Sequence, residues 1–74
     1  MNLLFGRSQQ ALNQAAAVVK RLSKEDRDYL YLRAQIQLVD GYSGLLRTKP
    51  DDLEYERRLQ QAIQELERVL RQVE

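Results

Sequence analysis

The chain has no cysteine and no histidine among its 74 residues. Disulfides and thiolate zinc sites are therefore excluded, and the commonest metal ligand and general base is missing. The aliphatic hydroxyls are those of Ser8, Ser23, Ser43 and Thr48, with no histidine to activate them. Ser23 and Lys20 could form a catalytic dyad, but a role as a helix cap explains Ser23 more simply. We therefore expect no catalysis and no cofactor.

Glycine and long apolar runs are also scarce. The three glycines are scattered at positions 6, 41 and 44, so no phosphate-binding loop is present. The apolar start at residues 3–5 ends at Gly6 and Arg7, which is too short for a signal peptide or a membrane span. The acidic pairs at 26/28 and 51/52 lack the glycine and late glutamate of a calcium loop, so we expect no metal site. We expect a cytoplasmic protein without a membrane span.

What the chain has in quantity is apolar and charged residues, at 43% and 31%. This balance is typical of a helix-rich globular domain, and the length allows one domain, residues 1–74. A domain this small has a limited core and usually gains stability from a partner. The net charge is only +1 and the basic residues are dispersed, which does not favour nucleic-acid binding.

The single proline, Pro50, separates two predicted helices. Asp51 followed by Glu54 has the spacing of a capping box and predicts that a helix begins here. Apolar residues then recur at spacings of four, three, four and three, which is a heptad seam within a helix over about 51–73. We call these residues the hairpin seam: Leu59, Ile63, Leu66, Leu70 and Val73.

A second helix is predicted over about 24–47, with Ser23 and Asp26 as its capping pair. It has two apolar stripes, and a helix apolar on two faces usually has neighbours on both. Gly41 and Gly44 weaken this helix; they mark a bend, permit a close approach by another backbone, or are simply tolerated. The first stripe contains Tyr29, Leu32, Ile36, Val39 and Leu46, and the second contains Tyr31, Ala34, Leu38, Tyr42 and Leu45, with Gly41 beside it.

An additional helix is predicted over about 8–22, after a flexible start at residues 1–7. Its apolar face holds Leu12, Ala15, Ala16, Val19 and Leu22. A break near Ser23 is favoured over one continuous helix, because continuing the face would place Asp26 and Arg33 on it. The prediction is an all-α domain: an antiparallel helical hairpin with an N-terminal helix. The second stripe, with Gly41, is the candidate partner interface, left for the N-terminal helix or for another protein.

Residues 45–70 carry a resemblance. Leu45, Leu46 and Arg47 precede the turn at Pro50, and Tyr55 precedes a seam containing Leu59, Ala62, Ile63, Leu66 and Leu70. This pattern resembles the small needle-subunit co-chaperones of bacterial type III secretion systems. The resemblance implies that the hairpin joins a larger tetratricopeptide-like chaperone. Together they would hold a secreted needle subunit unpolymerised in the cytoplasm.

The leading functional hypothesis is a non-catalytic protein-binding module, an adaptor or chaperone that packs against a partner's helices. Two alternatives stay open. One is a self-associating bundle of structural role, in which two hairpins form a homodimer. The other is a small DNA-binding regulator, because helix-turn-helix domains have this size.

Overall fold

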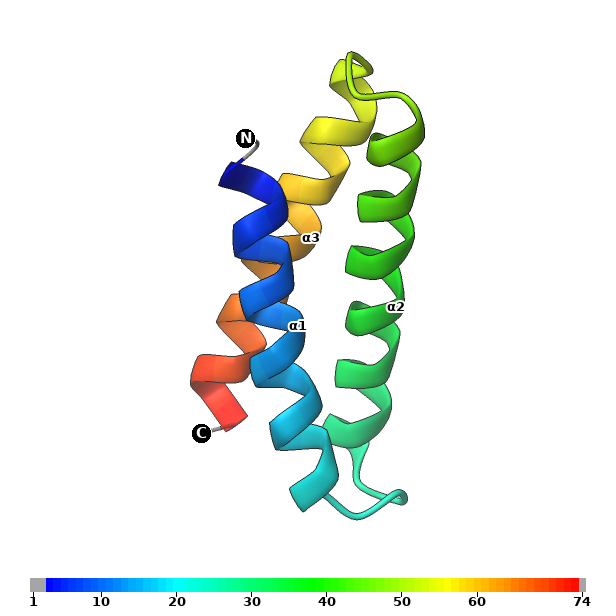
Figure 1. Cartoon of the computed structure of the whole chain (residues 1–74). Coiled ribbons are helices and arrows are strands. Elements are labelled where there is room, and N and C mark those ends of the chain that lie inside the picture. The colour runs from blue at the N-terminus through cyan, green and yellow to red at the C-terminus, as the bar shows by residue number, and fades with distance from the viewer. Residues whose placement is uncertain (1–2, 74) are drawn as a thin grey trace.

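The computed structural model describes residues 3–73, which form three α-helices and no strand. They are α1 (Leu3–Arg21), α2 (Arg27–Thr48) and α3 (Leu53–Val73). In Figure 1, α2 leads up to the turn and α3 leads back down from it, so the two helices run antiparallel. Helix α1 crosses in front of α3. Every pair of helices is in contact, most extensively α2 with α3. The predicted all-α class is confirmed.

The core lies where the three helices meet. Leu59, Ile63 and Leu66 of α3 are fully buried, Leu70 is nearly so, and Val73 is half-buried at the end of the helix. Their counterparts on α2 are Leu32, Val39 and Leu46, which have no exposed surface. Heptad spacing thus puts large aliphatic side chains of both helices into one continuous core.

The cap of α3 is one residue later than the sequence indicated. Asp52, not Asp51, accepts hydrogen bonds from the backbone N–H groups of Glu54 (3.0 Å) and Tyr55 (3.2 Å). The backbone N–H of Asp52 also donates to the carbonyl of Lys49 (3.0 Å), so Asp51 lies inside the turn. The prediction of Asp51 as the cap was wrong, because two adjacent aspartates offer the same chemistry and only the turn geometry selects between them.

The start of α2 is likewise displaced, from 24 to Arg27. Asp26 is the N-cap, and its carboxylate accepts a hydrogen bond from the backbone N–H of Asp28 (2.8 Å). Ser23 instead organises the preceding loop, where its hydroxyl donates to the Glu25 carboxylate (2.6 Å). The break favoured between the first two helices is present at residues 22–26.

The first helix differs most from expectation. It begins at Leu3 rather than at residue 8, so residues 3–7 are helical in place of the expected flexible start; residues 1–2 lie outside the described residues. Its buried face is also turned, since the expected Ala16 is exposed. Small side chains at the centre of the true face let α1 lie close to the hairpin. The buried residues are Leu4, Ser8, Ala11, Ala15 and Val18.

Two surface contacts fix the N-terminal half of α1 on the other helices. The Arg7 guanidinium forms an ion pair with Glu67 of α3 at 2.9 Å. The guanidinium of Arg47 on α2 lies over the ring of Phe5, 5.2 Å from its centroid. Exposed pairs of this kind add little stability, but they show that α1 is docked against both α2 and α3.

Candidate protein-interaction surface

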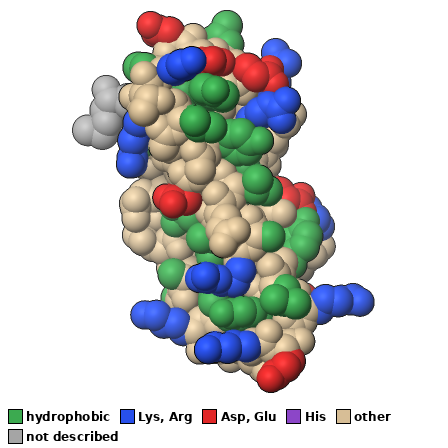
Figure 2. Space-filling model, turned by 90° about the vertical axis from the view of Figure 1, so that its right-hand side faces the viewer, with side chains coloured by type: hydrophobic (Ala, Val, Ile, Leu, Met, Phe, Trp, Pro, Cys, Tyr) green, Lys and Arg blue, Asp and Glu red, His purple; other side chains and the backbone are tan. Residues whose placement is uncertain are grey.

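The second apolar stripe of α2 is left uncovered by α1. We call it the α2 stripe, and its six residues are Tyr31, Ala34, Leu38, Gly41, Tyr42 and Leu45. Tyr31, Leu38 and Leu45 are 43%, 45% and 43% exposed. Ala34 and Gly41 are exposed as well, and Tyr42 is half-buried. Figure 2 looks onto this side of the molecule and shows several groups of hydrophobic side chains there, with charged side chains among them.

The α2 stripe has helical-interface spacing. Positions 31, 34, 38, 41 and 45 follow one another at intervals of three and four, so they share one face of the helix. The charged side chains within residues 29–47 of α2 are Arg33, Asp40 and Arg47, which are seven residues apart and lie along a different line of the helix. The α2 stripe itself therefore carries no charge.

Polar residues of α3 border the α2 stripe at its N-terminal end, next to Tyr31. The Tyr31 hydroxyl donates a hydrogen bond to Glu65 Oε1 at 2.7 Å. Arg68 forms an ion pair with the same carboxylate. Hydrogen bonding from Arg68, and next from Tyr31, lowers the pKa of Glu65, while the bond to Glu65 raises the pKa of Tyr31. The aromatic ring is thus held in place at the edge of the stripe.

The other end of the α2 stripe has a similar border. Arg58 of α3 forms an ion pair with Glu54, with 2.7 Å between Nε and Oε1. Glu54 first, and then the Tyr42 hydroxyl, raise the pKa of Arg58. Both tyrosines of the stripe therefore face α3, and their polar ends meet charged groups while the aliphatic residues between them face solvent. Apolar area surrounded by a polar rim is the usual anatomy of a protein interface.

Gly41 has no role in the packing of the chain itself. Helix α2 runs unbroken through it, and its φ is not positive. A Cβ atom built at Gly41 would meet nothing within 4 Å. The same holds for Gly44 and Gly6. Of the explanations left open above, a close approach by another part of this chain is excluded for residues 3–73.

The structure adds residues that the sequence did not indicate. Gln37 shares a shallow apolar hollow with four members of the α2 stripe, Leu38, Gly41, Tyr42 and Leu45. Glu65 and Arg68 join the site from α3 through Tyr31. Gln37 is a polar residue beside the stripe on the same helix, so an apolar pattern does not mark it, and the contact of Glu65 and Arg68 with Tyr31 depends on how α2 and α3 are aligned.

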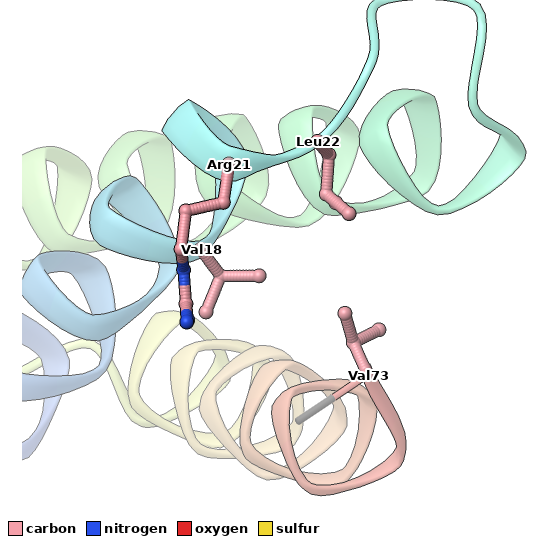
Figure 3. A pocket seen from close by; sticks show the side chains of 4 residues that line it. All are labelled: Val18, Arg21, Leu22 and Val73. Carbon is pink, nitrogen blue, oxygen red and sulfur yellow. The ribbon is translucent and has the colours of Figure 1, made fainter.

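A second hollow lies at the far end of the bundle (Figure 3). Val18 and Arg21 of α1, Leu22 just after it, and Val73 of α3 line it. Val18, Leu22 and Val73 point into a common space and Arg21 lies along one side. Its lining holds one charged group and no acid–base pair, so it provides no basis for a reaction. Within residues 3–73 no group of three or more acidic side chains is placed to hold a metal ion.

Comparisons with protein-family models, with curated proteins and with solved structures find no match. Within the described residues, no helix combines the length and apolar character that crossing a membrane requires. The functional argument therefore rests on the α2 stripe and its surroundings.

Proposed function

We propose that this chain is a non-catalytic protein-binding module that packs its α2 stripe against a helix of a partner polypeptide. One observation carries the proposal: large apolar side chains remain exposed on α2 after α1 has docked elsewhere. Tyr31, Leu38 and Leu45 are each more than two-fifths exposed, on one face of one helix. Contiguous apolar surface bordered by polar groups marks interaction sites in small proteins.

The spacing of the α2 stripe favours a helix as the bound element. Side chains at intervals of three and four form knobs and holes that match a second helix, whereas an extended peptide needs a free strand edge. The centre of the stripe is uncharged, and the charges at its border are the Glu65–Arg68 and Glu54–Arg58 pairs of α3. A partner helix with an apolar face and a polar margin fits this surface.

The resemblance of residues 45–70 gives the proposal a specific form. The α2–α3 pair acts as an antiparallel hairpin that supports the interaction surface, as in the needle-subunit co-chaperones. The partner is then a tetratricopeptide-like chaperone carrying a secreted subunit, and the complex acts in the cytoplasm. The uncovered α2 stripe supports this proposal because such an adaptor must present an apolar face to a larger protein.

Affinity capture from the native cell, with two matched variants, tests the proposal. Leu38→Glu places a carboxylate at the centre of the α2 stripe, and Ala17→Glu places one at an exposed position of α1. Both substitutions fall on exposed helix positions, so both variants should keep the wild-type circular dichroism spectrum. We expect wild type and Ala17→Glu to retain the same partner and Leu38→Glu to lose it. Capture of the same proteins by all three would refute the α2 stripe as the binding surface.

A further inference from the structure

Gly41 lowers the helical stability of α2, and no contact within residues 3–73 requires a glycine there. A glycine within a helix is less favourable than alanine, because it loses more backbone entropy on folding. Here no positive φ requires it, and open space surrounds the position where a Cβ would lie. The remaining property of glycine is that a neighbouring molecule can approach the helix backbone closely. Gly41 lies in the middle of the α2 stripe, so that approach would occur at the proposed binding surface.

Bulky and small residues alternate along the same face. The bulky residues Tyr31, Leu38 and Leu45 are seven apart, and so are the small residues Ala34, Gly41 and Thr48, offset from them by three. A second α2 helix running antiparallel brings each bulky residue opposite a small one. A parallel pair in register would instead set Leu38 against Leu38 and Gly41 against Gly41, giving alternately crowded and empty layers.

We propose that a second copy of this chain occupies the α2 stripe, with the two α2 helices antiparallel about a two-fold axis. Leu38 sits over Gly41 of the second copy, and Leu45 over its Ala34. Each contact occurs twice, as two-fold symmetry requires. This inference rests on the proposed function, since it concerns the same surface: the second copy covers the α2 stripe while no larger partner is bound, and the two compete for it.

Charge and size agree with this assignment. Between Tyr31 and Leu45 the charged residues of α2, Arg33 and Asp40, lie off the stripe, so like charges do not meet along it when two α2 helices pair. The stripe from Tyr31 to Leu45 is about 21 Å long at the helical rise and only one helix wide, so we expect it to bury less than the ~800 Å² per partner of a standard stable complex. We therefore expect a weak, reversible dimer that forms at micromolar concentrations or above.

Sedimentation analysis of the full chain up to about 1 mM tests the dimer, and Gly41→Leu tests its packing. Gly41→Leu adds apolar surface and favours the helix. If the chains associated only through general hydrophobicity, without close packing, this variant would therefore associate more strongly. A closely packed helix pair instead loses affinity by about tenfold or more, because the added side chain fills the space that the second backbone needs. Gly6→Leu, at an open helical position on α1, is the control and should leave the dimer constant unchanged.

The orientation can be measured because the chain has no native cysteine. Ala34→Cys and Leu45→Cys chains, made separately and mixed under mild oxidation, should form the mixed 34–45 disulfide. Each single variant alone should form little covalent dimer, since equivalent positions are far apart in an antiparallel pair. Crosslinking of each variant to itself would overturn the antiparallel arrangement.

A wild-type chain that stays monomeric at about 1 mM overturns the inference, and so does tighter association of Gly41→Leu. The proposed function is decided separately. If the chain is monomeric but loses a captured partner on Leu38→Glu, the second copy is excluded while the α2 stripe remains a binding surface. If the mixed disulfide forms and Gly41→Leu weakens the dimer, the second copy is established as the occupant.

Discussion

Replacing the two aspartates of the α2–α3 turn one at a time provides the sharpest test of the fold. The Asp52 carboxylate accepts two backbone hydrogen bonds at the start of α3, at 3.0 Å and 3.2 Å. Loss of an N-cap of this type costs about 1 kcal/mol, within a range of about 0.5–2. Asp51 has the same charge one residue earlier and accepts neither bond, so the difference between the two alanine variants isolates the hydrogen bonds from the helix dipole.

We expect Asp52→Ala to lower the free energy of unfolding by about 1 kcal/mol more than Asp51→Ala does. For a domain of this size that difference corresponds to a melting temperature lower by about 4–8 °C. Thermal and urea denaturation followed by circular dichroism at low protein concentration would measure it. Asp52→Asn keeps an acceptor oxygen and should recover most of the loss. Equal effects of the two alanine variants, or a larger effect at Asp51, would refute the assignment of the cap.

Four further predictions concern packing, electrostatics and backbone entropy. Leu66→Ala should cost about 2–5 kcal/mol, because its fully buried side chain leaves a cavity, whereas Leu53→Ala, at a 75% exposed position, should change stability by less than about 0.5 kcal/mol; urea denaturation measures both. Glu65→Gln should lower the pKa of Tyr31 back toward 10.0 in an NMR titration, because the hydrogen bond to the carboxylate is its main cause of elevation. The pKa of Glu65 itself is lowered from its ordinary value of 4.5. The stability that its carboxylate contributes is therefore present above pH 4.5 and is lost as the pH falls through the folded-state pKa. Acid denaturation of wild type compared with Glu65→Gln measures this loss. Gly6→Ala should raise the melting temperature, because the position is helical and open, and a lowered value would show that the backbone there needs glycine.

The parts of the fold that large side chains determine could be predicted from the sequence. Leu59, Ile63 and Leu66 contrast strongly with the polar residues between them, so their spacing indicates both the helix and its buried face. The first helix lacks that contrast. Its buried face is built from Ser8 and Ala11 as well as larger residues, and small side chains are buried or exposed with little difference in hydrophobic free energy.

The candidate site was only partly predictable for a related reason. Periodicity places Leu38 and Leu45 on one face of α2, but it does not say whether α1 covers that face. That depends on where α1 docks, and small residues such as Ala15 direct it to the opposite side of the hairpin. Glu65 joins the site through a bond between residues 34 positions apart, which needs the alignment of two helices.

The odd number of helices in residues 3–73 has a practical consequence. The chain enters and leaves the bundle near opposite ends of its 39 Å long axis, and in Figure 1 both ends lie on the side away from α2. A fluorophore, an affinity tag or a solid support coupled beyond Leu3 or Val73 therefore starts on the side of the bundle away from α2. Immobilised or labelled chains should keep the apolar face of α2 free, so biosensor measurements can use either attachment point.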